Sequence, residues 1–178
     1  MKQFRVAHPL IVIVVSVALA QLACGSSAPT AAAQQSATTA AQPAATASER
    51  GSSDEAKAML RLAVEHYQTV GRDQALADFN AGQPPFMDRD LYVVCLGADH
   101  VELANGGFPS AVGASPDGLQ DVEGRPLGQA MWDELASSDE GSIRYDWLNP
   151  VSGETEPKIL FIHKLDDVLC GVGAYNPG

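Results

Sequence analysis

The chain has 178 residues and a formal net charge of −11, from 11 Lys plus Arg against 22 Asp plus Glu. This length suits one domain of ordinary size, and the acidic balance argues against nucleic acid or an anionic membrane surface as a partner. The 46% of hydrophobic residues is inflated by alanine in the first fifty positions, whereas nearly all aromatic residues lie from Tyr67 onward. The hydrophobic core must therefore come from the C-terminal two thirds of the chain.

The first 24 residues are typical of an export signal. Lys2 and Arg5 form a short basic region, and the apolar run 10–20 that follows is shorter than the roughly 20 residues of a membrane span. Cys24 resembles the lipidated cysteine of bacterial lipoproteins, and ordinary cleavage after Ala20 is the alternative. We expect an exported protein, held by a lipid on the outer face of the cell membrane or in the periplasm. Without the signal, nine Lys plus Arg face 22 acidic residues, for a net charge of −13.

Residues 25–52 are almost entirely Ala, Ser, Thr, Gln, Gly and Pro, with no aromatic residue. Such a composition cannot bury enough apolar surface to offset the entropy lost on ordering. We therefore expect a disordered tether between the anchor and a single folded domain of residues 53–178.

Two helices open the predicted domain. Ser53 is expected to cap the first helix, in which apolar residues recur at three- and four-residue spacing until Gly71. Asp73 is expected to cap a second, shorter helix, which ends at the Gly82–Pro85 segment. A third helix is predicted farther along the chain, at residues 127–135.

Five segments are predicted as strands, because β-branched and aromatic residues gather there between turn residues. They are residues 91–96, 101–103, 142–147, 158–164 and 168–174. Short connectors between the last three make them antiparallel neighbours. The order of elements predicts an α+β domain built on one five-stranded antiparallel sheet.

Short motifs along the strands, in a fixed order, resemble the single Cache domain (second Cache type) of bacterial extracytoplasmic sensors. They include Tyr92-Val-Val, Leu103-Ala-Asn105, Asp121-Val-Glu-Gly-Arg125, Tyr145-Asp-Trp147-Leu-Asn149-Pro-Val-Ser-Gly153, Pro157-Lys158 and Gly171-Val-Gly173-Ala-Tyr175. The resemblance covers residues 54–176. It implies a PAS-like sheet, a long N-terminal helix, and a small ligand, often a short carboxylate or an amine, under a helix-and-loop cover. In most relatives the domain belongs to a membrane chemoreceptor or kinase; here we expect a stand-alone domain with such a protein as its partner.

Lys158 is the first candidate ligand-binding residue. Strand alternation places it on one face with Leu160 and Ile162, where an inward ammonium needs a partner such as a ligand carboxylate. The resemblance also places Lys158 at the lysine of the family motif. The alternative is a lysine that reaches solvent from the strand end.

Tyr145 and Trp147 share a face of the preceding strand and suit either a ligand pocket or plain core.

Four further residues are weaker candidates. Relatives commonly have His at the position of Asn105, so ligand specificity is expected to differ if that residue contacts the ligand. Arg125 could bind a carboxylate with both guanidinium nitrogens, or pair with a neighbouring acid in a turn. Tyr92 and Tyr175 could contribute hydroxyl groups. We expect the acids to lie mostly on turns and outer faces, which makes Lys158 and Arg125 the informative charges.

Two cysteines remain if Cys24 carries a lipid. In a PAS-like sheet the strands of Cys95 and Cys170 are adjacent, so a disulfide is conceivable in an oxidising compartment. Two buried free thiols are the alternative.

No catalytic or metal-binding pattern stands out. His100 lies beside two acids but no second histidine follows at metal-ligand spacing, and the Gly171–Gly173 segment is expected to leave room for something to approach the backbone. We expect a non-enzymatic module that binds a small molecule without a cofactor. The alternative is a protein-interaction or structural lipoprotein whose pocket is filled by its own side chains.

Overall fold

The computed structural model describes residues 50–177, and the predicted signal, Cys24 and most of the predicted tether lie outside this part. The helices are α1 (Ser53–Val70), α2 (Arg72–Asn80) and α3 (Leu127–Glu134), with short 3-10 turns at Pro109–Ala111 and Pro116–Gly118. The strands are β1 (Met87–Asp88), β2 (Leu91–Gly97), β3 (Glu102–Asn105), β4 (Glu140–Leu148), β5 (Thr155–Leu165) and β6 (Val168–Tyr175).

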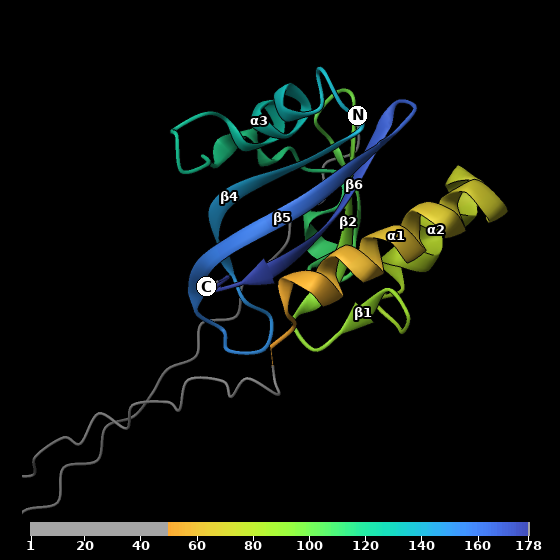
Figure 1. Ribbon diagram of the computed structural model, residues 1–178, viewed down its shortest axis with the longest axis horizontal. Coiled ribbons are helices and arrows are strands. Elements are labelled where there is room, and N and C mark those ends of the chain that lie inside the picture. The colour runs from red at the N-terminus through yellow and green to blue at the C-terminus, as the bar shows by residue number, and fades with distance from the viewer. Residues whose placement is uncertain (1–49, 178) are drawn as a thin grey trace, which may run out of the picture. The chain divides into compact units, whose positions relative to one another are not determined.

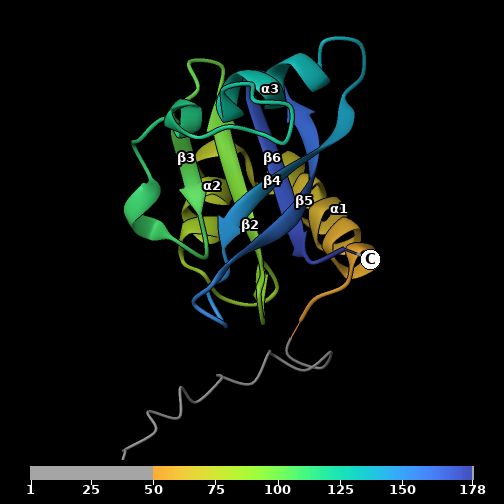
Figure 2. The same cartoon turned by 90° about the vertical axis from the view of Figure 1, so that its left-hand side faces the viewer.

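The strands form one antiparallel sheet in the order β1-β2-β6-β5-β4, with β3 also paired to β2. The predicted α+β, PAS-like architecture is confirmed. The sheet has six strands rather than five, because the two residues of β1 pair with the start of β2. Helices α1 and α2 cover one face of the sheet, and α3 lies with the preceding loop over the other (Figures 1 and 2).

Helix α1 begins one residue earlier than predicted. Ser52, not Ser53, is the N-cap: its hydroxyl accepts a hydrogen bond from the Glu55 amide, and the Glu55 carboxylate accepts one from the Ser52 amide. This reciprocal pair satisfies two amides that the first helical turn leaves open. Gly71 ends α1 with a φ of 86°, as the sequence predicts. Asp73 does not cap α2, because that helix already begins at Arg72 and has no side-chain cap.

The folded domain extends farther toward the N-terminus than the predicted boundary at residue 53. Arg50 forms a two-pronged ion pair with the buried Glu156, and the Gly51 amide donates to the Asp90 carboxylate at 2.6 Å. Residues 50–52 are therefore part of the domain and not of a tether.

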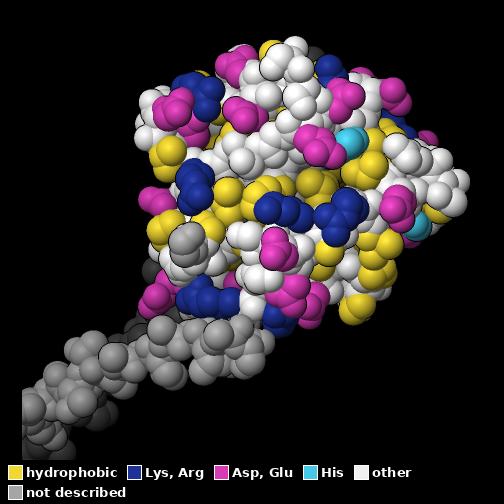
Figure 3. All heavy atoms as spheres, in the orientation of Figure 1, with side chains coloured by type: hydrophobic (Ala, Val, Ile, Leu, Met, Phe, Trp, Pro, Cys, Tyr) yellow, Lys and Arg dark blue, Asp and Glu magenta, His cyan; other side chains and the backbone are white. Residues whose placement is uncertain are grey.

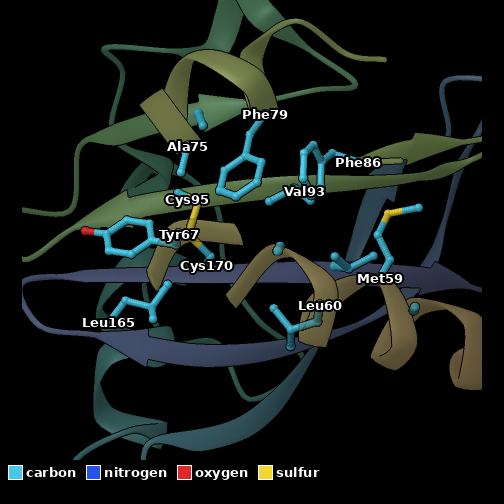
Figure 4. Packing of buried hydrophobic residues seen from close by; sticks show 14 of the residues in the cluster. Met59, Leu60, Tyr67, Ala75, Phe79, Phe86, Val93, Cys95, Leu165 and Cys170 are labelled. Carbon is cyan, nitrogen blue, oxygen red and sulfur yellow. A yellow bond between two sulfur atoms is a disulfide. The ribbon is translucent and has the colours of Figure 1, made fainter. Parts of the chain in front are cut away.

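One hydrophobic cluster fills the space between the sheet and the two N-terminal helices. Apolar residues of α1 such as Met59, Leu60 and Tyr67 pack with Phe79 of α2 against inward residues of β2 and β6 (Figure 4). Within this cluster Cys95 and Cys170 face each other across β2 and β6 and are joined by a disulfide. Of the two possibilities left open by the sequence, the structure has the bonded pair.

A second cluster lies on the opposite face, under α3. Leu127 and Met131 of this helix and Leu135 directly after it pack on β4, β5 and β6. The Trp132 indole donates to the Gly97 carbonyl at 2.9 Å. Because α3 rests on this face, the loop and helix form the cover that the sequence predicts.

The acidic residues do not form one continuous patch on the face shown in Figure 3. They are dispersed, and a row of Lys and Arg side chains crosses the middle of this face. Several acids are not on the outside at all: Asp90, Asp121 and Glu156 are buried. The expectation that acids lie mostly on turns and outer faces is thus wrong for these three residues.

Candidate ligand-binding site

A small cavity lies between the sheet and the cover. Its volume is about 30 Å³, two to three times the roughly 10–15 Å³ that one water molecule requires. We call it the α3 cavity; it is lined by Tyr92, Val94, Cys95, Leu96, Glu102, Pro116, Leu127, Met131, Tyr145, Trp147 and Leu169. The cavity has room for a group of a few atoms.

Lys158 turns into the protein, and the alternative in which it reaches solvent is wrong. Its side chain is only 2% exposed. The ammonium nitrogen donates to the hydroxyl of Tyr92 at 2.8 Å and to that of Tyr175 at 3.3 Å, and lies 4.1 Å and 4.6 Å from their ring centroids. Burial lowers the pKa of Lys158 to about 7, although the charges of Asp90 and Glu102 partly oppose that shift. Lys158 does not itself line the α3 cavity.

Gly173 creates the space that Lys158 occupies. A Cβ at Gly173 would lie 2.0 Å from Cε of Lys158, and one at Gly171 would lie 3.0 Å from a methyl carbon of Ile162. The two glycines leave a bare strip of β6 on the α3 face, as the sequence predicts. The groups that approach it are side chains of β5.

The two tyrosine hydroxyls continue a directed chain of hydrogen bonds from Lys158. Tyr175 donates its single hydroxyl hydrogen to the Leu148 carbonyl at 2.8 Å, so in the 3.0 Å contact between the two hydroxyls Tyr92 is the donor. Burial raises the pKa of Tyr92 and of Tyr175 far above the usual range. Both tyrosines are therefore neutral, and they accept two of the three hydrogen bonds that the Lys158 ammonium can donate.

Tyr145 and Trp147 both line the α3 cavity, and each keeps a polar atom without a partner. The Trp147 indole nitrogen is buried and makes no hydrogen bond, although it lies near the Tyr92 hydroxyl. No hydrogen bond joins the Tyr145 hydroxyl to another described residue, and burial raises its pKa well above the usual value. Unpartnered buried polar groups are rare in folded proteins, so the Trp147 indole, with the Tyr145 side chain in the same lining, indicates a place for a bound molecule.

Glu102 is a cavity residue that the sequence reasoning missed. One carboxylate oxygen accepts from the Asn105 amide at 2.7 Å, and the other makes no hydrogen bond within the described residues. Burial raises the pKa of Glu102. A β-bulge explains the omission: Cys95 pairs with Ala104 but Leu96 pairs with Glu102, so one extra residue turns Glu102 to the α3 face.

Asn105 and Arg125 do not line the α3 cavity. The Asn105 side chain holds Glu102 and accepts from the amides of Gly107 and Phe108 at 3.2 and 2.7 Å, so it fixes the turn after β3. Arg125 pairs with Asp121 at 2.8 Å and reaches Glu123 at 3.4 Å. For Arg125 the structure has the turn pairing that the sequence left as an alternative.

The Asn149 motif forms a second buried polar cluster, away from the cavity lining. The Asn149 amide donates to Asp90 and Glu156 at 3.2 Å each, and its oxygen accepts from the Val151 amide at 2.8 Å. Arg50 pairs with the same Glu156. This cluster ties the N-terminal flank and the β4–β5 turn to the sheet, which is a structural role.

Within the described residues, no group of three or more His, Cys, Asp or Glu is placed to hold a metal ion. None of the helices at residues 50–177 is long and apolar enough to cross a membrane.

The antiparallel sheet, with helices on one face and a covered cavity on the other, is a PAS-like architecture. The family model for single Cache domain 2 matches residues 30–176, so the chain belongs to this family. The match begins well before the expected residue 54, in a stretch outside the described part. Cache domains are sensory modules that bind small molecules.

Solved structures of chemosensory domains share this fold. A methyl-accepting chemotaxis protein from Vibrio parahaemolyticus RIMD 2210633 is 20% identical, with a TM-score of 0.57 over 68% of this chain and 86% of that one. A periplasmic sensor domain of a chemotaxis protein is 18% identical, with a TM-score of 0.51 and coverage of 69% and 89%. A Cache chemosensory domain described for carboxylic acid recognition is 17% identical, with a TM-score of 0.52 and coverage of 69% and 87%. No curated protein matches the chain.

Proposed function

We propose that this chain is a non-enzymatic, extracytoplasmic sensor or ligand-presenting module that binds a small molecule in the α3 cavity. The observation that carries the proposal is the pair of unpartnered polar atoms, on Tyr145 and Trp147, that line an otherwise mainly apolar cavity. Such a cavity with a few polar groups is the usual form of a small-molecule site. Membership of the Cache family supports the same conclusion.

A short carboxylate is one ligand class that the sequence resemblance predicts, with Lys158 as its partner. The ammonium can donate three hydrogen bonds and makes two, to Tyr92 and Tyr175, so a carboxylate that reached it would accept the third. A carboxylate bound in this way would raise the pKa of Lys158 and hold it charged.

A thermal-shift screen with short carboxylates, amino acids and amines tests the proposal. At least one class should raise the melting temperature in proportion to the logarithm of its concentration, as expected for binding to the folded state alone. Lys158→Ala should abolish a shift caused by a carboxylate, whereas Lys57→Ala on α1 should leave it unchanged. A broad panel with no shift would refute the small-molecule function.

The lipid anchor and the membrane partner belong to the same proposal. Lipidation of Cys24 would place the domain on the outer side of a membrane, where a receptor or kinase could receive the liganded form. Metabolic labelling with a radioactive fatty acid should mark the wild-type chain and not Cys24→Ser. Equal labelling of both chains would exclude Cys24 as the attachment site.

The small volume of the cavity favours a second candidate, a protein-interaction or structural lipoprotein with a vestigial pocket. In that case Trp147 is simply the filling of the pocket, and Trp147→Ala would destabilise the protein without changing any response to small molecules. Leu160 packs in the hydrophobic cluster under α3 and does not line the cavity, so it is not part of such a filling.

A further inference from the structure

One charged side chain, Glu102, lines the α3 cavity, and the Lys158 ammonium lies near enough behind the lining to act on the pKa of that carboxyl. Among its lining residues Glu102 is the one ionisable group other than tyrosine and the disulfide-bonded Cys95, and the cations Lys158 and Arg125 are absent from the lining. One oxygen of Glu102 is held by Asn105, while the other has no hydrogen bond to a described residue. Burial raises the pKa of this carboxyl, and the Asn105 hydrogen bond and the Lys158 charge partly oppose that shift, so a cationic ligand beside it would further favour its charged form.

Aromatic rings form much of the remaining wall. Tyr92, Tyr145 and Trp147 line the cavity, and the ring of Phe108 packs edge-on against Tyr92 and Trp147 at centroid separations of 5.8 and 6.0 Å. Ring faces carry partial negative charge and attract ammonium groups. The Trp147 indole offers a carboxylate ligand one hydrogen-bond donor, but such a ligand would also face the like charge of Glu102.

Resting on the proposed function, we propose that the α3 cavity takes the ammonium group of a small amine, with Glu102 as its counter-ion and the surrounding aromatic rings as its cage. The volume of about 30 Å³ suits a head group of a few atoms. The unpartnered Trp147 indole is a hydrogen-bond donor, so an amine that carries a neighbouring hydroxyl oxygen satisfies it as well. This ligand class is opposite in charge to the short carboxylate predicted from the sequence.

Isothermal titration calorimetry on the full chain at pH 8 tests the inference with four probes of similar size: ethylamine, ethanolamine, acetate and glycolate. The wild type should bind the two amines, with ethanolamine tighter than ethylamine, and neither carboxylate. This comparison uses only the wild-type chain and holds even if a variant fails to fold. Binding of acetate or glycolate without the amines would overturn the inference and leave the proposed function standing.

Two variants assign the contacts. Glu102→Gln keeps an acceptor for Asn105 but removes the charge, and should weaken amine binding at least tenfold. Glu65→Gln, an exposed position on α1, removes the same charge and should change nothing. Trp147→Phe should remove the preference for ethanolamine over ethylamine.

Equal affinity of wild type and Glu102→Gln for the amines would exclude Glu102 as the counter-ion. If none of the four probes binds, the amine inference is wrong. The thermal-shift panel on the same preparation then decides separately whether the protein binds any small molecule.

Discussion

The buried ammonium of Lys158 predicts an unusual dependence of stability on pH. The pKa of Lys158 is about 7 in the folded protein, against 10.5 for an ordinary lysine. Between these values the unfolded chain binds more protons than the folded one, so stability must rise with pH. Well below pH 7 both states carry the proton and the cost of burying the charge is fully present, whereas at pH 7 the folded Lys158 is already about half neutral.

The size of this effect follows from the two pKa values. A single group shifted in this way makes stability rise by at most roughly 1.4 kcal/mol per pH unit, and by about 2 kcal/mol between pH 7 and pH 9. Lys158→Met keeps a long apolar side chain over Gly173 but removes the titrating group. In that variant the rise should disappear.

Urea unfolding of the wild type and Lys158→Met at half-unit steps from pH 7 to pH 9 measures the effect as the difference between the two chains. Contributions from other titrating groups cancel in that difference. Lys57→Met removes a lysine whose side chain is 48% exposed, and should retain the wild-type rise. A difference between wild type and Lys158→Met that stays flat from pH 7 to pH 9 would refute the assignment of Lys158 as a buried, readily neutralised amine.

Three further predictions concern the framework of the site. Gly173→Ala places a methyl group 2.0 Å from Cε of Lys158 and should lower the free energy of unfolding in urea by about 1–3 kcal/mol. The loss should be smaller in a Lys158→Ala background, and equal losses in both backgrounds would contradict the steric explanation. Asn149→Ala removes one hydrogen bond from each of two buried carboxylates and two backbone amides. It should lower the free energy of unfolding in urea by about 3 kcal/mol, and a loss below about 0.5 kcal/mol would show that the cluster is dispensable. The Cys95–Cys170 disulfide spans 75 residues and should contribute about 4 kcal/mol; intact protein should gain alkyl groups at these cysteines only after reduction, and alkylation without reductant would exclude the bond.

The arrangement of helices and strands was largely accessible from the sequence. Hydrophobic spacing located α1 and α3, and β-rich runs located the five longer strands to within a few residues. The two-residue β1 carries no periodic signal, and it exists because the turn after it folds its residues back on β2. The N-terminal boundary was misplaced because composition does not reveal distant partners. Arg50 is held by Glu156, 106 residues away, and Gly51 by Asp90, 39 residues away.

The candidate site was only partly accessible. Alternation predicted one shared face for Tyr145 and Trp147 and another for Lys158 with Leu160 and Ile162, and the structure shows that both are the covered face of the sheet. Asn105 and Arg125 were chosen for what their side chains can do, but local turns already occupy both groups. The bulge beside Leu96 could not be read from the sequence, and it alone brings Glu102 to the cavity.

The sequence by itself determined which side chains alternate inward, because a strand has a fixed period of two and glycines at 171 and 173 leave a bare strip on one face. Only the tertiary structure decided what those side chains meet. Lys158 is compensated by two tyrosines from β2 and β6, and the free carboxylate oxygen of the cavity comes from β3. The sign of charge in a pocket depends on contacts between strands far apart in the chain, and those contacts exist only once the sheet has formed.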